Sequence, residues 1–384
     1  MYWIAASTLV PGDSNGHRDV FLRDCILGTT EMISVVGNDE GLPGNSIYPQ
    51  VTPDGRFVVY SSLGWDQVAG DTNSCSDIFL RDRVLAATER ISVSSAGEEA
   101  NDHSYWASIS ADGRHVLFWS YASNLVPDDT NGAADAFVRD RLLGITERVS
   151  VSTGGEQGDR HSYAGSITPD GRFVAFNSLA TNLVDGDTAG KEDIFVRDRL
   201  LGTTERVSVS TSGAQANNEC GRASLSADGR FVAFESWAAN LVPNDTNLMM
   251  DIFVRDRLNG TTERVSLTSS GNQGIGTGFG AWACSISADG RFVAFTADFT
   301  NLVPGDWNEC ADIFVKDRQT GATERCSLAY TGFQPDKSSY RTAISAEGRF
   351  VAFVSDASTI VPGDTNFAAD GFRDERQTTR RRVS

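Results

Sequence analysis

The chain has 384 residues, 40% of them hydrophobic and 22% charged, and its formal net charge at neutral pH is −18. This charge argues against nucleic acid or an anionic membrane surface as a partner, because both attract positive patches, and it favours cations or basic partners. No stretch approaches the ~18 uninterrupted apolar residues of a membrane span. Six cysteines without Cys-x-x-Cys spacing make a zinc site an unfavoured interpretation.

One tripeptide, Asp-Gly-Arg, divides the chain into repeats. The turns begin at Asp54, Asp112, Asp170, Asp228 and Asp289, with a sixth, Glu-Gly-Arg, copy at Glu347. The steps between them are 58, 58, 58, 61 and 58 residues. A fixed period of this size indicates a stack of supersecondary units, each made from the same elements.

Each repeat contains four strand-like runs. In the third full copy the first run is Tyr163 to Thr168, and an Asp-Gly turn, the strongest short hairpin signal, leads to a second, apolar run from Phe173 to Phe176. A long loop then precedes the third run, Ile194 to Arg197, and a short turn precedes the fourth, Glu205 to Val209. No run has a helical period. Four antiparallel strands per repeat predict a β-propeller blade.

The third-strand signature occurs seven times, whereas the first strand and its Asp-Gly turn occur six times. We therefore predict an all-β fold, a seven-bladed β-propeller of four-stranded antiparallel blades in which the first blade is incomplete. It forms a single domain over residues 1–384, with approximate blades at 1–36 (partial), 45–94, 103–152, 161–210, 219–268, 280–329 and 338–384. Met1 to Ile4 aligns with the end of a second strand, so we expect either that Met1 is not the natural start or that the first blade is truncated.

The repeat also resembles a known family. Residues 285–295 read SISADGRFVAF, and the third-strand signature reads DIFVRD at Asp193 and Asp251, with variants of it in the other copies. This pattern is similar to the TolB-type, WD-like β-propeller repeat of bacterial envelope and secreted proteins. The resemblance covers nearly the whole chain and implies a propeller fold and a periplasmic or extracellular location. Such repeats occur in scaffolds, receptors and some hydrolases, so the resemblance leaves the function open.

The loops between second and third strands are acidic. Six of them read Asp-x-Asn-x-x-x-Asp, and in the seventh Ala189 replaces the Asn. Oxygen ligands at positions 1, 3 and 7 are similar to half of a calcium loop, which predicts Ca²⁺ as a cofactor. The alternative is that the Asp and Asn side chains form Asx-turns. The candidate metal ligands are Asp13, Asn15, Asp19, Asp71, Asn73, Asp77, Asp129, Asn131, Asp135, Asp245, Asn247, Asp251, Asp306, Asn308, Asp312, Asp364, Asn366 and Asp370.

A second candidate site lies where the repeat varies. Nine residues before each turn, at the start of the innermost strand, three consecutive blades carry His103, His161 and Glu219. Two imidazoles and a carboxylate are a ligand set for a transition metal, or an acid and base pair. The alternative is that they are ordinary polar loop residues. Aromatic residues two positions further on, such as Tyr105 and Tyr163, either line the same place or pack between the inner strands.

Strand direction separates the two ends of each blade. The acidic loops and the His and Glu positions lie at one end, and the arginines of the Asp-Gly-Arg, Arg-Asp-Arg and Thr-Glu-Arg segments lie at the other. His115 occupies the place of Phe173 and is interpreted as a packed core histidine. We predict a non-enzymatic binding or scaffold propeller that meets a protein or polar ligand at its acidic loops. The alternative is a metal-dependent lyase or hydrolase that uses His103, His161 and Glu219.

Overall fold

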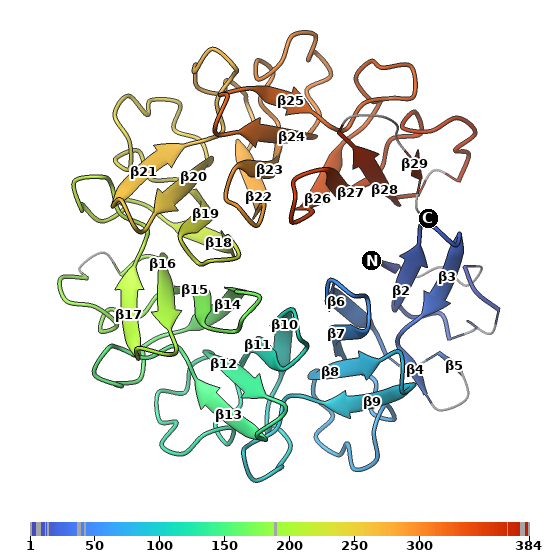
Figure 1. Cartoon of the computed structure of the whole chain (residues 1–384), viewed down its shortest axis with the longest axis vertical. Helices are drawn as coiled ribbons and strands as arrows, with labels where there is room; N and C mark the ends of the chain where they lie inside the picture. Colours follow the sequence, from blue (N-terminus) through green and yellow to red (C-terminus); the bar gives the residue numbers. More distant parts are fainter. Residues whose placement is uncertain are drawn as a thin grey trace. The chain divides into compact units, whose positions relative to one another are not determined.

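The computed structural model describes residues 2–4, 9–11, 13, 15–36, 40–41, 44–187, 190–366, 368–376 and 381–382, and all regular structure in this part of the chain is β (Figure 1). Each Asp-Gly-Arg or Glu-Gly-Arg repeat forms one four-stranded antiparallel sheet whose strands pair in chain order. The first and second strands join at the repeated turn, where Gly171 has a φ of +74°. The second and third strands are buried along most of their length, as their continuous apolar runs predict.

The described residues contain six such sheets. They are β6 (Ser46–Val51), β7 (Phe57–Ser62), β8 (Asp77–Asp82) and β9 (Ala87–Arg90); β10 (Ser104–Ile109), β11 (His115–Ser120), β12 (Asp135–Asp140) and β13 (Ile145–Arg148); β14 (Ser162–Ile167), β15 (Phe173–Ser178), β16 (Asp193–Asp198) and β17 (Thr203–Arg206); β18 (Cys220–Leu225), β19 (Phe231–Ser236), β20 (Asp251–Asp256) and β21 (Thr261–Arg264); β22 (Ala281–Ile286), β23 (Phe292–Ala297), β24 (Asp312–Asp317) and β25 (Thr323–Arg325); and β26 (Ser339–Ile344), β27 (Phe350–Ser355), β28 (Asp370–Glu375) and β29 (Arg381–Arg382).

The prediction of seven blades is wrong, because six four-stranded blades form. The N-terminal segment gives a three-stranded sheet of β1 (Tyr2–Ile4), β2 (Asp19–Asp24) and β3 (Thr29–Met32), beside a separate pair, β4 (Val35–Val36) and β5 (Glu40–Gly41). β1 pairs with β2 in the register of a second strand. This segment carries the third-strand signature but no Asp-Gly turn. Among the described residues, the sheet therefore has three strands, and none of them is in the first-strand position.

Two compact units divide the described chain. Unit 1 comprises Met1–Gly190 and Val196–Glu205, and unit 2 comprises Lys191–Phe195 and Arg206–Ser384. The boundary therefore runs through the sheet of β14 to β17. No helix in the described residues is long and apolar enough to cross a membrane. All six cysteines are free thiols.

Within a unit, neighbouring sheets are held together by arginines and by glycine contacts. Arg114 forms a bidentate pair with Asp140 inside its own sheet, with Nη2 2.6 Å from Oδ2. Arg141 reaches Glu89 of the preceding sheet and lies over the Phe57 ring, 4.7 Å from its centroid. A Cβ added at Gly113 would come within 2.2 Å of the same ring, so glycine lets the turn lie directly on Phe57.

His115 is packed in the position that phenylalanine occupies in the other sheets, as predicted. Its Nδ1 is buried and has no hydrogen-bond partner among the described residues, and a Cβ at Gly171 would lie 2.4 Å from that atom. Burial, with a smaller contribution from Arg199, lowers the pKa of the His115 imidazole from its usual value of 6.5. The folded state therefore disfavours protonation that the unfolded chain accepts.

We expect His115→Phe to raise the free energy of unfolding by about 1 kcal/mol at pH 7, because it removes an unsatisfied buried nitrogen. The gain should grow as the pH falls below 6.5, where the unfolded wild-type chain binds a proton that the native site resists. Urea unfolding between pH 5 and pH 8 measures both effects. Phe173→His, the reverse change at the equivalent position, should introduce the same acid sensitivity, and a pH-independent difference would contradict this account.

Candidate functional site

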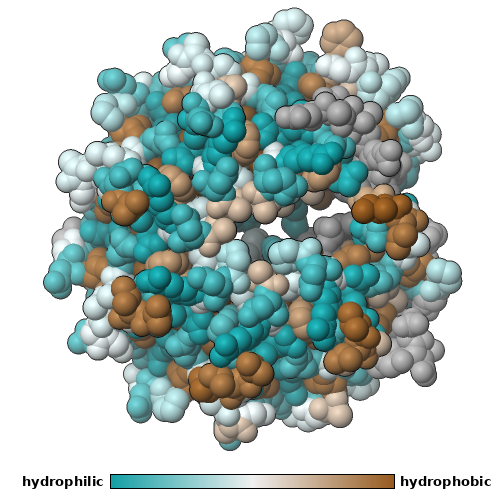
Figure 2. Space-filling view, in the orientation of Figure 1, coloured by the Kyte–Doolittle hydropathy of each residue, from teal (hydrophilic) through white to brown (hydrophobic). Residues whose placement is uncertain are grey.

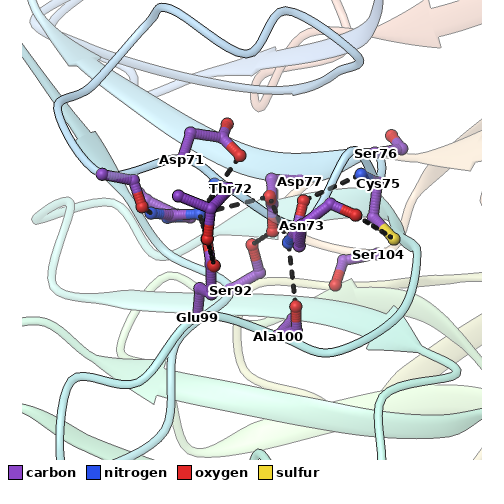
Figure 3. Close-up of polar contacts among 12 residues, drawn as sticks. Asp71, Thr72, Asn73, Cys75, Ser76, Asp77, Ser92, Glu99, Ala100 and Ser104 are labelled. Atoms are coloured by element: carbon purple, nitrogen blue, oxygen red, sulfur yellow. Dashed lines mark hydrogen bonds and ion pairs between the residues drawn. The ribbon is translucent and has the colours of Figure 1, made fainter.

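The acidic loop between β7 and β8 shows how the predicted ligands are used (Figure 3). Asn73 Oδ1 accepts a hydrogen bond of 2.8 Å from the Cys75 amide, which closes an Asx-turn. Asn73 Nδ2 donates to Asp77 Oδ2 at 3.0 Å and to the Ala100 carbonyl at 2.8 Å. The Ser92 hydroxyl donates to Asp77 Oδ1. The loop therefore satisfies its own side chains and is tied to the following segment of chain.

An arginine of the fourth strand neutralises the two aspartates of the loop. Arg90 Nη1 lies 3.5 Å from Asp71 Oδ1, 3.5 Å from Asp77 Oδ2 and 2.6 Å from Glu99 Oε2. The prediction that the Thr-Glu-Arg arginines lie at the opposite end of the blade is wrong. Arg90 pairs with Phe79, near the start of β8, and this register places the arginine beside the acidic loop.

The same arrangement recurs in the other loops. Arg148 pairs with Asp129 and Asp135 at 3.6 and 3.3 Å, and Arg264 pairs with Asp245 and Asp251 at 2.8 and 3.0 Å. The other loops that contain an Asn keep one of these two bonds. The Asn side chain donates to the second Asp in the pairs Asn15 and Asp19, Asn131 and Asp135, Asn247 and Asp251, and Asn366 and Asp370. In the loop from Asp306 to Asp312, Asn308 forms the Asx-turn.

These contacts bear on the predicted calcium sites. Burial raises the pKa of Asp71 and Asp245 to about 6 in spite of the nearby arginines. In the loops of Arg90, Arg148 and Arg264, the carboxylates that would face Ca²⁺ already lie within ion-pair distance of a guanidinium, and the second Asp also accepts an N–H group from asparagine. The geometry favours the structural alternative for these loops, and calcium binding by them stays a prediction.

His103, His161 and Glu219 share one structural role. His103 Nδ1 accepts the Ser76 amide at 2.8 Å, and His161 Nδ1 accepts the Ala134 amide at 2.9 Å. Because Nδ1 is the acceptor, the neutral imidazoles carry their proton on Nε2.

Other residue types fill the same position. Glu219 Oε2 accepts the Glu192 amide at 2.8 Å, and Asn45 Oδ1 accepts the Arg18 amide at 2.9 Å. Each acceptor satisfies the amide just before a third strand in the preceding repeat. His103 and His161 belong to unit 1 and Glu219 to unit 2.

An aromatic cluster lies between the two histidines, and we define it as Tyr105, Trp119, Tyr121 and Tyr163. The Trp119 ring centroid is 5.0 Å from Tyr105, 5.5 Å from Tyr121 and 5.1 Å from Tyr163. The rings are partly buried, and Tyr121 is 40% exposed. These distances fit tilted and edge-to-face aromatic packing.

His103 and His161 extend the aromatic cluster at its two ends, at 5.7 Å from Tyr105 and 6.1 Å from Tyr163. Tyr105 and Tyr163 were candidates from the sequence, whereas Trp119 and Tyr121 were not predicted. The available signal was the departure of Trp119 from the repeat, since Asn177 occupies the equivalent place in the next sheet.

One group in the described residues has the spacing of a metal site. Ligand atoms of Cys75, Asp102 and His103 all lie within 4.8 Å of one another. Burial, and after it the charge of Asp102, raises the pKa of the Cys75 thiol. Metal binding needs the thiolate, so this environment disfavours the group as a metal centre.

Exposed hydrophobic side chains gather at the turns between third and fourth strands of unit 1. They are Ile26, Leu27, Val84, Leu85, Leu142, Leu143, Leu200 and Leu201. On the face drawn in Figure 2, hydrophobic side chains form small groups within a largely hydrophilic surface. The aromatic cluster is the more concentrated apolar feature of unit 1.

No protein-family model and no curated protein matches the chain. It is similar to the β-propeller domain of the Trilobed protease from Pyrococcus furiosus, with 10% identity, a TM-score of 0.58 and coverage of 96% of this chain and 90% of that one. It is also similar to an oligogalacturonate lyase in complex with manganese, with 11% identity, a TM-score of 0.57 and coverage of 94% and 83%. These likenesses show a β-propeller fold.

TolB proteins are among the similar structures, as the sequence resemblance predicted. TolB from Acinetobacter baumannii is 18% identical, with a TM-score of 0.45, and the match covers 84% of this chain. The chain spans 61% of the length of that TolB.

Proposed function

We propose that the chain is a non-enzymatic binding propeller whose aromatic cluster holds a basic segment of a partner protein. Aromatic faces attract guanidinium and ammonium groups, and the attraction strengthens where water is partly excluded. Burial raises the pKa of the Tyr105 hydroxyl, and the charge of Asp102 makes a smaller contribution. A net charge of −18 adds long-range attraction for a basic partner.

The observation that carries this proposal is the shared backbone role of the histidine positions. Asn45 has no acid or base function near neutral pH, yet it accepts a backbone amide at the position equivalent to those that His103 and His161 accept. A structural role therefore accounts for the histidines without catalysis. The cluster of partly exposed aromatic side chains between the two histidines, in contrast, does not recur in every repeat, so the repeated structure does not account for it.

A metal-dependent lyase or hydrolase is the second candidate, favoured by the close approach of Cys75, Asp102 and His103. The likeness to an oligogalacturonate lyase is one of fold, and a chain with a net charge of −18 repels a polyanionic substrate. We also propose a periplasmic or extracellular location, which rests on the resemblance to TolB-type repeats.

We expect Trp119→Ala to weaken the binding of a hexa-arginine peptide by about tenfold or more, which corresponds to about 1.4 kcal/mol and is within the range of a desolvated cation–π contact. Isothermal titration calorimetry at low salt measures the affinity, and circular dichroism and the Tm establish that the variant is folded. Trp65→Ala is the matched control, because Trp65 is also in unit 1 and is 62% exposed. It should bind the peptide as the wild type does.

Two results would contradict the binding function. Equal affinity of the Trp119→Ala and Trp65→Ala variants would remove the aromatic cluster from recognition. Turnover of oligogalacturonate by the wild type with Mn²⁺, abolished by His103→Ala in a folded variant, would establish the enzyme instead. A hexa-glutamate peptide should show no binding in either case.

A further inference from the structure

The N-terminal sheet lacks the arginine that lies beside both loop aspartates in four of the other sheets, which is Arg90, Arg148, Arg264 or Arg325. The third and fourth strands pair Phe79 with Arg90 in one repeat and Phe253 with Arg264 in another, whereas β2 and β3 pair Phe21 with Met32. The equivalent positions of the six four-stranded sheets are Arg90, Arg148, Arg206, Arg264, Arg325 and Arg382. Methionine therefore occupies, in the N-terminal sheet, the strand position that arginine has in these six sheets.

Among the residues that the structure describes there, the side chain of a second donor group is also missing. In the later repeats the isolated bridge after the fourth strand brings a polar side chain to the loop, and Gln157 Nε2 donates to Asp129 Oδ1 at 2.8 Å and Asp135 Oδ2 at 3.0 Å. The corresponding pairing in the N-terminal segment joins Val35 to Gly41. Glycine has no side chain with which to donate.

Both aspartates of the first loop are buried all the same. Asp13 is 7% exposed and Asp19 is 0% exposed. Asp19 accepts hydrogen bonds from Ser34 Oγ at 2.6 Å and Asn15 Nδ2 at 2.9 Å. Asp13 Oδ2 is a buried oxygen with no hydrogen-bond partner in the part of the chain that the structure describes.

Among the described residues, no arginine forms an ion pair with Asp13 or Asp19, whereas Arg264 Nη1 lies 2.8 Å from Asp245 and 3.0 Å from Asp251. A buried carboxylate with neither a counter-ion nor a full set of donors is costly, so the site is suited to an added cation.

We propose that Asp13 and Asp19 bind one hard divalent cation, which takes the place of the missing arginine. Carboxylate oxygens, with amide oxygens and water completing the shell, are the donors that Ca²⁺ and Mg²⁺ prefer. The sequence pattern predicted calcium in six loops, and this inference confines the site to the first loop, where Met32 stands at the position of the arginines. It is independent of the proposed peptide-binding function, because the aromatic cluster lies on other strands.

The test compares Met32→Arg with Met32→Leu in otherwise full-length protein. The wild type and Met32→Leu should bind one Ca²⁺ or Mg²⁺ per chain in calorimetric titration, and their Tm in EGTA should rise by several degrees when 1 mM of the cation is added. Met32→Arg supplies the guanidinium that the other loops have. In EGTA, Met32→Arg should unfold at a higher temperature than the wild type. Its affinity for the cation should be at least tenfold lower, and its Tm should no longer rise when the cation is added.

A second variant guards against a general effect of adding charge. Asp13→Asn keeps the shape of the side chain but removes one charged ligand, and it should also lose the cation response. The inference is overturned if the wild type binds neither cation at millimolar concentration. It is equally overturned if Met32→Arg and Met32→Leu respond alike, since the bound ion would then lie elsewhere.

Discussion

Arg264→Met should destabilise the folded chain by about 3–5 kcal/mol, because it leaves two buried carboxylates without their counter-ion. The Arg264 side chain is 7% exposed, and its Nη1 lies 2.8 Å from Asp245 Oδ1 and 3.0 Å from Asp251 Oδ2. Chemical denaturation at pH 7 measures the loss. The variant reproduces in unit 2 the residue that the N-terminal sheet has naturally at Met32.

The loss should depend on pH with a definite sign. Burial raises the pKa of Asp245 to about 6 in the native wild type, from its usual value of 3.8. A carboxyl whose pKa is higher in the folded state than in the unfolded state lowers the free energy of unfolding. This cost is present in full above the native pKa and shrinks as the pH falls towards 3.8. Without Arg264 the native pKa rises further, and the variant should recover stability on acidification more than the wild type does.

Two comparisons test this explanation of the Arg264 effect. Arg291→Met removes an arginine whose side chain is 37% exposed and which pairs with Asp317 at 2.7 Å, so we expect a loss of about 1 kcal/mol or less. Adding Asp245→Asn to Arg264→Met should restore part of the lost stability, since one uncompensated charge is removed. Equal losses for the two arginine variants, or a larger Arg264 loss at pH 5 than at pH 8, would contradict the burial argument.

Gly290→Ala should destabilise unit 2 by about 3 kcal/mol, because the new Cβ meets a fixed aromatic ring as well as an unfavourable backbone angle. Gly290 has a φ of +73°, and an added Cβ would lie 2.1 Å from Phe231 Cδ2. The turn cannot move easily, since the Gly290 amide donates to the Ser287 carbonyl at 2.9 Å. The free energy of unfolding from urea titration gives the size of the effect.

Gly305 provides a matched control for the backbone contribution. Its φ is +77°, close to that of Gly290, but no atom lies within 4 Å of an added Cβ. Gly305→Ala should therefore show the left-handed strain alone, about 1 kcal/mol. In a Phe231→Ala background, Gly290→Ala should fall to that same value. Equal effects of the two alanine substitutions in the wild-type background would show that the ring contact has no energetic role.

Much of the fold could be predicted from local features of the repeat. In the third full copy the predicted runs from Tyr163 and Phe173 correspond to β14 and β15, and the run from Ile194 corresponds to β16. The fourth strand, β17, begins two residues earlier than predicted. The seventh blade was counted from the third-strand signature alone, and the structure shows that this signature without a first strand and Asp-Gly turn gives only a three-stranded sheet.

The candidate site was less accessible to prediction. The sequence identified the loop aspartates and the positions of His103 and His161, but their partners lie far along the chain. His161 accepts the Ala134 amide 27 residues earlier, and Arg148 reaches Asp135 from the next strand. Trp119 joins Tyr105 and Tyr163 across two sheets. None of these contacts follows from spacing within one repeat.

The sequence by itself determined the all-β class, the strands of each repeat and the turn that joins the first two, because turn chemistry and apolar runs act over a few neighbouring residues. Only the tertiary structure decided which charges are neutralised and which are left over. That outcome depends on strand register, which brings Arg90 to Asp71 and Asp77 and places Met32 at the equivalent position of the N-terminal sheet. A buried carboxylate is stable or costly according to its partner, and the partner is chosen by packing between strands.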